Sequence, residues 1–178
     1  MADENAEIAR GLRRRDPDLL DRLIEKYQHR LLRYLVHLTG RRDLAEDVFQ
    51  ETWIRVLERG RQYDGRHEFG TWLFVLARNL AIDQARRRRG TDEAPCDIAV
   101  TGQPTAFDLT VRREQNDRIS AGMQQLTAEH REALVLRFQE EMSLEEIATV
   151  TRAPLGTVKS RIYRGLSALG PWLQGGGL

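Results

Sequence analysis

Residues 143–169 read SLEEIATVTRAPLGTVKSRIYRGLSAL and combine two short helical patterns with a tight connection between them. Ser143 is followed three positions later by Glu146, an arrangement that caps the start of a helix. Pro154 is typical of the first position of a helix and predicts where the second one begins. Two short helices joined by so few residues indicate a helix-turn-helix, whose second helix enters the major groove of DNA.

The second helix of this pair carries its positive charge on one side. Val158 and Ile162, four residues apart, fit the face that packs against the first helix. On the other side, arginine can pair with a guanine edge and lysine with a phosphate. The alternative is a helical hairpin whose basic face is only solvated. The residues predicted to face DNA are Thr157, Lys159, Ser160, Arg161, Tyr163 and Arg164.

The chain before residue 90 is also helical by its pattern. Asp16 followed by Pro17 predicts a helix that runs to about Leu38 and that Gly40 closes. Another helix is expected from about residue 69 to 87, because its apolar residues recur at helical spacing.

Between these two, a helix is expected to begin at Asp43 and to end at Gly60. Asp43 and Glu46 have the spacing of a capping box. Residues 43–51 contain four acids and no base, which predicts an acidic face; in most helices such a face is only solvated. The apolar face is predicted to run through Leu44, Val48, Trp53, Val56 and Leu57.

Helical periodicity fades over residues 90–110, which hold Gly90, Pro95, Gly102 and Pro104 together with four unbalanced acids. Four short helices are expected after this segment, and Thr127 caps the second of them. The fold class is therefore all-α: two small helical domains, 1–89 and 111–178, joined by a flexible acidic linker, with the helix-turn-helix in the second domain.

Aromatic and basic side chains are concentrated between residues 63 and 89, where 86–89 are four consecutive arginines. Aromatic platforms beside a cationic track are what proteins use to bind single-stranded nucleic acid. Core packing is the alternative, because Trp72 and Phe74 cannot share one helix face. The candidates for this surface are Tyr63, Phe69, Trp72, Arg78, Asn79, Arg86 and Arg87.

Composition argues against several functional classes. The single cysteine, Cys96, rules out an internal disulfide and a Cys-based zinc finger, and it fits a reducing cytosol. The longest apolar run, 72–77, is too short to span a membrane. The stretch from Gly156 to Ser160 lacks the glycine that a phosphate loop has before its lysine, and the histidines lack zinc-site spacing. We therefore expect no enzyme activity, no cofactor and no metal.

Three stretches, in this order and separation, resemble the extracytoplasmic-function (ECF) sigma factors of the sigma-70 family. They are LAEDVFQETWIRVL at 44–57, FGTWLFVLARNLAIDQARRRR at 69–89, and residues 143–169. GTVKSR at 156–161, preceded by EIA at 146–148, is the most specific marker. The resemblance covers about residues 19–170.

This resemblance implies a factor that binds core RNA polymerase, directs it to promoters and helps to melt the minus-ten element. The first domain is then similar to sigma region 2. Its loop 61–68 and the helix from Phe69 would read and melt that element, with one flipped base of the non-template strand held near the loop. The second domain is similar to region 4 and would read the minus-thirty-five element. The implied contacts to the clamp helices of the polymerase beta-prime subunit are Asp43, Glu46, Asp47, Gln50 and Glu51.

The resemblance also implies partners and a location. Region 4 would contact the beta flap, the linker would thread the polymerase cleft, and an anti-sigma partner is possible. The expected location is the cytoplasm, on the nucleoid when bound to polymerase. A stand-alone DNA-binding regulator or a signalling adaptor is the alternative. It differs in not needing core polymerase to bind promoter DNA.

One position departs from the family. Arg152 stands in the turn where glycine is frequent. Positive φ is uncommon for a non-glycine residue. Arg152 therefore either takes another turn geometry or accepts left-handed strain to place a charge near a phosphate. This makes it a seventh candidate contact to the upstream element.

Overall fold

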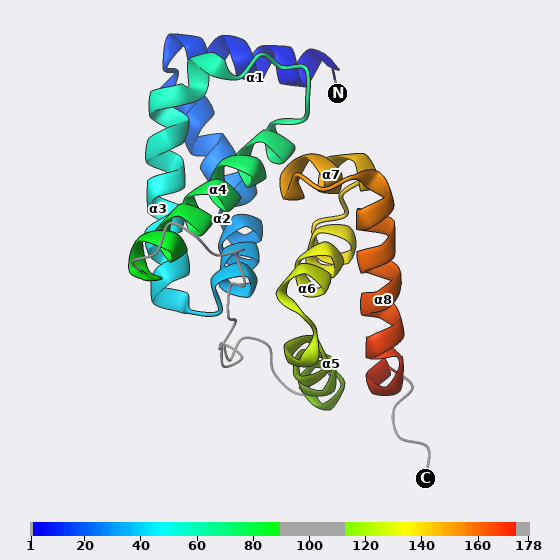
Figure 1. Cartoon of the computed structure of the whole chain (residues 1–178). Coiled ribbons are helices and arrows are strands. Elements are labelled where there is room, and N and C mark those ends of the chain that lie inside the picture. Colours follow the sequence, from blue (N-terminus) through cyan, green and yellow to red (C-terminus); the bar gives the residue numbers. More distant parts are fainter. Residues whose placement is uncertain (1, 90–112, 174–178) are drawn as a thin grey trace.

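The computed structural model describes residues 2–89 and 113–173, and both segments are helical (Figure 1). The first segment contains α1 (Ala2–Arg14), α2 (Pro17–Thr39), α3 (Arg42–Arg59), the 3₁₀ turn η1 (Gly60–Gln62) and α4 (Phe69–Arg89). The second contains α5 (Arg113–Gln125), α6 (Ala128–Leu134), the π-helical turn η2 (Val135–Gln139), α7 (Leu144–Thr151) and α8 (Leu155–Leu173). The all-α prediction is confirmed, while the predicted linker 90–110 lies outside the described residues.

Several predicted helix ends are confirmed by their hydrogen bonds. The Asp16 carboxylate accepts from the backbone N–H of Asp18 and Leu19, with Pro17 at the first helical position. Gly40 closes α2 in the left-handed conformation, with φ of 67°. No helix in the described segments is long and apolar enough to cross a membrane.

The prediction for α3 is wrong in three respects. The helix begins one residue earlier, and Asp43 and Glu46 pair with Arg41 and Arg42 instead of forming a capping box. Asp43 lies inside the first turn, so its carboxylate cannot act as the flanking cap. Leu57 is 50% exposed, because it follows buried Val56 and each residue turns the helix by about 100°.

The core of the first half lies between α2, α3 and α4. Leu31, Tyr34, Leu35, Leu73 and Phe74 are fully buried there. Helix α1 was not predicted, yet one side of it joins the same core. The apolar spacing of Ile8 and Leu12 is the signal that would have revealed it.

In the second half the predicted caps of α6 and α7 are confirmed. The Thr127 hydroxyl accepts from the backbone N–H of His130, and Ser143 and Glu146 form the reciprocal capping box. Helix α8 continues to Leu173, past Pro171, whereas the pattern predicted an end near residue 169.

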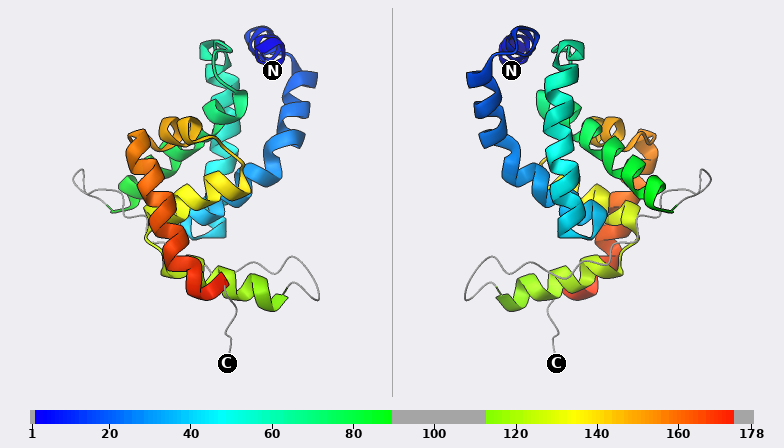
Figure 2. Two further views of the ribbon diagram at one scale, coloured as in Figure 1. Left: turned by 90° about the vertical axis from the view of Figure 1, so that its right-hand side faces the viewer. Right: turned by 90° about the vertical axis from the view of Figure 1, so that its left-hand side faces the viewer.

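The two halves pack against each other, α4 against α7 and α2 against α6 (Figure 2). Polar contacts cross this boundary at several points. The Thr71 hydroxyl donates to Glu146 at 2.7 Å. Burial alone would raise the pKa of Glu146, but the bonds from the Ser143 backbone and from Thr71 offset it and leave that pKa lowered.

Candidate nucleic-acid and polymerase interfaces

Helix α8 presents the basic face that the sequence predicts. Val158 is completely buried and Ile162 is partly buried against the core, which fixes the rotation of the helix. Lys159 and Arg164 are exposed, and Tyr163 is 73% exposed. Thr157 and Ser160 are half-buried. The arrangement places two cations and a phenol on one solvent-facing helix.

Arg161 differs from its neighbours on α8. Its guanidinium contacts the Glu129 carboxylate of α6 at 2.7 Å, and its side chain is only 17% exposed. The pair ties α8 to α6. Arg161 therefore supports the helix pair in this structure and is not presented outward like Lys159.

Arg152 occupies the turn between α7 and α8 in the left-handed conformation, with φ of 53°. Its backbone N–H donates to the Ala148 carbonyl, as a glycine cap would. The side chain is exposed beside the start of α8. Of the two geometries considered, the strained one is found.

The aromatic residues predicted for the downstream surface divide between core and surface. Tyr63 and Phe69 are 2% and 1% exposed, so the prediction that they present rings to nucleic acid does not agree with their burial. The Tyr63 hydroxyl donates to the His67 carbonyl at 2.7 Å, and its ring meets Phe69 edge-on. Trp72 packs beside both but stays partly exposed. Of these three rings, only that of Trp72 therefore reaches the surface.

Along α4, the remaining candidates have different surroundings. Asn79 is half-buried, while Arg86 and Arg87 are exposed at the far end of the helix. Arg78 is 16% exposed and donates to the Glu132 carboxylate of α6 at 2.7 Å. Arg78 is thus engaged in the contact between the two halves.

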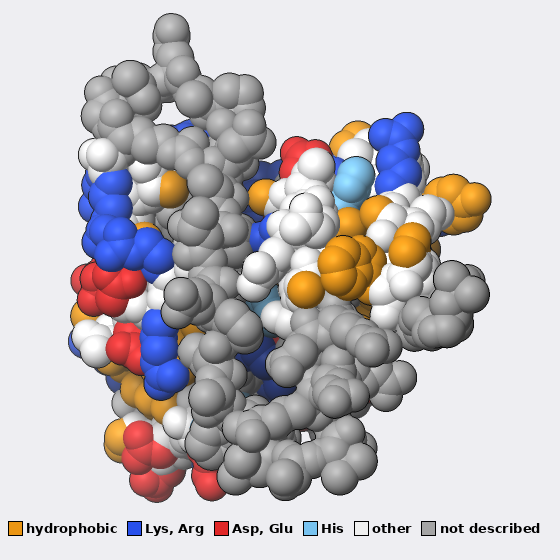
Figure 3. Space-filling view, turned by 90° about the horizontal axis from the view of Figure 1, so that it is seen from below, with side chains coloured by type: hydrophobic (Ala, Val, Ile, Leu, Met, Phe, Trp, Pro, Cys, Tyr) orange, Lys and Arg blue, Asp and Glu red, His pale blue; other side chains and the backbone are white. Residues whose placement is uncertain are grey.

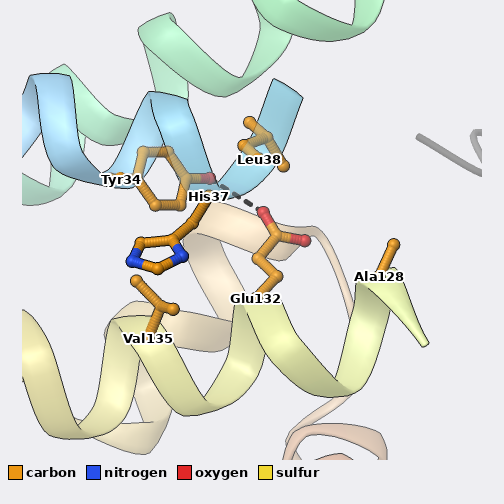
Figure 4. A pocket seen from close by; sticks show the side chains of 6 residues that line it. All are labelled: Tyr34, His37, Leu38, Ala128, Glu132 and Val135. Carbon is orange, nitrogen blue, oxygen red and sulfur yellow. Dashed lines mark hydrogen bonds between the residues drawn. The ribbon is translucent and has the colours of Figure 1, made fainter. Parts of the chain in front are cut away.

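Glu132 joins both halves of the molecule, because it also accepts from the Tyr34 hydroxyl at 2.8 Å. Burial is the main reason that the pKa of Tyr34 is raised well above its usual range, and the nearby Glu132 charge is the next largest cause. A small pocket beside this bond lies between α2 and α6 (Figure 4). His37 lines this pocket, and its pKa is lowered mainly by burial and next by the charge of Arg131. No residue predicted to bind nucleic acid lines this pocket.

Three acidic residues of α3 lie with Gln50 along one face of the helix. Asp43, Asp47, Gln50 and Glu51 recur at helical spacing, and all but half-buried Glu51 are exposed. Arginines accompany this face: Arg55 contacts Glu51 at 2.9 Å, and Arg88 of α4 approaches Asp47 at 4.0 Å. Glu46 lies exposed beside them.

Sequence reasoning missed one apolar residue of this face, Ile54, and placed another, Leu57, in the core. Ile54 and Leu57 are 49% and 50% exposed. Ile54 follows Gln50 by four positions, so it extends the acidic face with an apolar end. Mixed acidic and apolar helix faces are suited to docking another protein. The interruption of an acidic stripe by large aliphatic residues was the available signal.

Seen from below, hydrophobic side chains gather on the half that holds α8, whereas charges of both signs alternate on the half that holds α3 (Figure 3). On α8 the large exposed apolar residues are Leu155, Tyr163, Leu166 and Trp172. Phe138 of η2 is also 59% exposed.

The two helical units each match a family model of the sigma-70 class. Residues 23–91 match the family described as Sigma-70 region 2, and residues 116–169 match Sigma-70, region 4. The chain is 34% identical to the RNA polymerase sigma-H factor of Pseudomonas aeruginosa, covering 97% of this chain and 95% of the relative. It is 30% identical to the ECF RNA polymerase sigma factor SigW of Bacillus subtilis, covering 86% of this chain and 88% of the relative.

Two solved structures share the fold. CnrH, in complex with the cytosolic domain of CnrY, superposes with a TM-score of 0.70 at 20% identity, over 97% of this chain and 99% of that one. The sigma factor RpoE, in complex with the anti-sigma factor NepR from Bartonella quintana, gives 0.66 at 22% identity, over 88% and 98%. The chain belongs to the ECF sigma factors of the sigma-70 family, as its three motifs predicted.

Proposed function

We propose that this chain directs RNA polymerase to specific promoters through three surfaces, each with its own binding role. Helix α8 reads the upstream element, the loop before α4 together with α4 reads and opens the downstream element, and α3 holds core polymerase. The observation that carries the proposal is the rotation of α8, which buries Val158 and turns Lys159, Tyr163 and Arg164 to solvent.

The upstream contact follows from the chemistry of these side chains. An arginine paired with a guanine edge discriminates between bases, whereas a lysine on a phosphate binds every sequence alike. Arg152, which has a strained backbone and an exposed side chain beside the start of α8, supplies a further cation for a DNA phosphate.

The downstream surface is narrower than the sequence suggested. With Tyr63 and Phe69 in the core, we assign stacking to Trp72 and phosphate contacts to Arg86 and Arg87, with Asn79 between them. Opening a duplex costs unstacking energy, and stacking on an aromatic ring returns roughly 1–3 kcal/mol per base. The chain acts by binding and positioning, and no catalytic step of its own is needed.

The acidic and apolar face of α3 is proposed to dock on a basic surface of core polymerase. Charge complementarity would steer the encounter, and Ile54 and Leu57 would be buried on docking. One structural neighbour is bound to an anti-sigma factor. We extend such regulation to this chain as part of the proposal: a partner of that kind would cover a surface that polymerase needs.

Run-off transcription with purified core enzyme on a genomic promoter library tests this function. The wild type should direct initiation from a small set of promoters sharing two elements. Promoter binding that is equally strong without core polymerase would contradict the proposal and favour a stand-alone regulator.

The first mutational prediction concerns α8. Lys159→Ala and Arg164→Ala should each weaken use of the upstream element, and loss of a base contact should cost about 1–3 kcal/mol and relax specificity. Ser167→Ala, exposed further along α8, is the matched control. Wild-type transcription by both variants at several salt concentrations would refute the role of this face.

A further inference from the structure

Helix α1 lies against the loop that the proposed function assigns to the downstream element. The loop runs alongside α1 before the chain descends into α4 (Figure 1). Ile8, Ala9 and Leu12 are 5%, 3% and 8% exposed, so the inner side of α1 belongs to the same core as α2 and α4. Helix α1 is therefore packed into the core of this domain.

Two glycines allow the backbone after α3 to approach α1 closely. A Cβ added at Gly60 would lie 3.1 Å from the Leu12 Cβ. A Cβ added at Gly65 would lie 3.1 Å from the Asn5 carbonyl oxygen and 3.5 Å from the Ala6 Cα. Backbone atoms of a helix cannot rotate away as a side-chain end can. The contact at Gly65 is therefore one of backbone on backbone.

The conformation of Gly65 also depends on glycine. Its φ is +76°, a value that L-residues adopt at a cost of about 1–2 kcal/mol. The backbone N–H of Arg66 donates to the Asp64 carboxylate at 3.0 Å and closes the turn around this residue. Steric contact and backbone angle thus both restrict the same position.

The loop is held on its other side by the aromatic core. Buried Tyr63 anchors its start and donates to the His67 carbonyl, which spans the loop. The side chains of Asp64 and Arg66 point outward, 53% and 84% exposed. A fixed inner side and exposed outer side chains are the features of a pre-organised binding loop.

We propose that α1 is a positioning element for promoter reading: by holding Gly65, it fixes the loop 63–68 in the shape that selects one unpaired base of the downstream element. This role rests on the proposed function. Selection between bases needs groups held within about 0.5 Å of the productive geometry. A loop released from α1 would still bind nucleic acid but would discriminate less well.

The test approaches the contact from both sides. Gly65→Asn adds a Cβ against Asn5 while asparagine tolerates positive φ, and Leu12→Ala loosens α1 beneath the loop. Each full-length variant is assayed with core polymerase on pre-melted promoters that differ by one base at each downstream position. We expect a loss of discrimination of about fivefold at one position, equal to roughly 1 kcal/mol.

If Gly65→Asn and Leu12→Ala both act by releasing the loop, combining them gives a second test. The double variant should lose no more discrimination than the stronger single variant, because both changes release the same loop from α1. Discrimination at the upstream element should stay unchanged in all three proteins.

Two controls separate positioning from stability. Gly170→Asn adds a side chain where nothing lies within 4 Å. Leu169→Ala removes a leucine that is 5% exposed in the other half, so it lowers the unfolding temperature without touching the loop. If Gly65→Asn and Leu12→Ala keep the wild-type base preference, α1 serves stability alone. If the wild type itself shows no downstream base preference with core polymerase, the proposed function fails, and this role with it.

Discussion

At the scale of single residues, Arg152 has a backbone conformation that lowers the stability of the fold. Its left-handed backbone costs about 1–2 kcal/mol relative to a helical one, and glycine would avoid most of this cost. Its side chain is exposed, so packing does not compensate for the strain. Strain that persists without packing is frequent at functional positions.

Arg152→Gly should therefore raise the free energy of unfolding by up to about 1 kcal/mol, since relief of strain exceeds the added freedom of the unfolded chain. The same change should weaken binding to the upstream element. Chemical denaturation and promoter binding measure the two effects. Arg152→Ala is the control, because it removes the charge but keeps the strain. Equal stability of the two variants would show that the turn is unstrained.

At the scale of the element, α3 combines a buried side with the face that we propose docks on core polymerase. Val48 and Val56 lie in the core, while Asp47 and Ile54 face solvent. The ion pairs within this face, such as half-buried Glu51 with Arg55, are still in contact with solvent and contribute little to stability. The face can therefore change without loss of the fold.

The double change Asp47→Arg, Glu51→Arg should abolish association with core polymerase, because like charges across a steered interface can cost several kcal/mol. The matched control is Asp21→Arg, Glu25→Arg, an equal charge change at exposed positions of α2 with the same spacing. A pull-down with purified core decides between them. Undiminished binding by the α3 variant, or equal loss in the control, would contradict docking through this face.

At the scale of the whole molecule, ion pairs to a buried glutamate join the two halves. Glu140 has no exposed side-chain surface and contacts Arg30 of α2 at 2.8 Å and Arg33 at 3.4 Å. Arg30 also donates to the Glu140 backbone carbonyl. Removing one member of a buried pair leaves the others poorly satisfied. The relative placement of the halves thus depends on a few side chains.

Glu140→Gln should loosen the contact between the halves, at a cost of roughly 1–3 kcal/mol, because both arginines remain partly solvated. Small-angle scattering should show a larger radius of gyration, while helix content by circular dichroism stays the same. Glu141→Gln, an exposed neighbour, is the control. An unchanged radius of gyration would mean that apolar packing alone holds the halves together.

Local patterns in the sequence were enough for the fold class, the family and most helix ends. Asp16, Thr127 and the Ser143–Glu146 box act within one turn of helix, so their hydrogen bonds follow from spacing alone. Periodicity placed Val158 in the core and Lys159 outside for the same reason. The motif order then indicated the sigma-70 family before any contact was known.

Only the tertiary structure decided which candidates are free to bind. Tyr63 and Phe69 have the composition of a stacking surface, but they are buried against α2 and α4. Arg78 meets Glu132, 54 residues away, and Arg161 meets Glu129 of another helix. Residue type and local spacing define what a side chain can do. Its partners across long sequence separations are fixed by how whole helices pack. This packing alone determines whether a side chain pairs within the protein or stays available to bind another molecule.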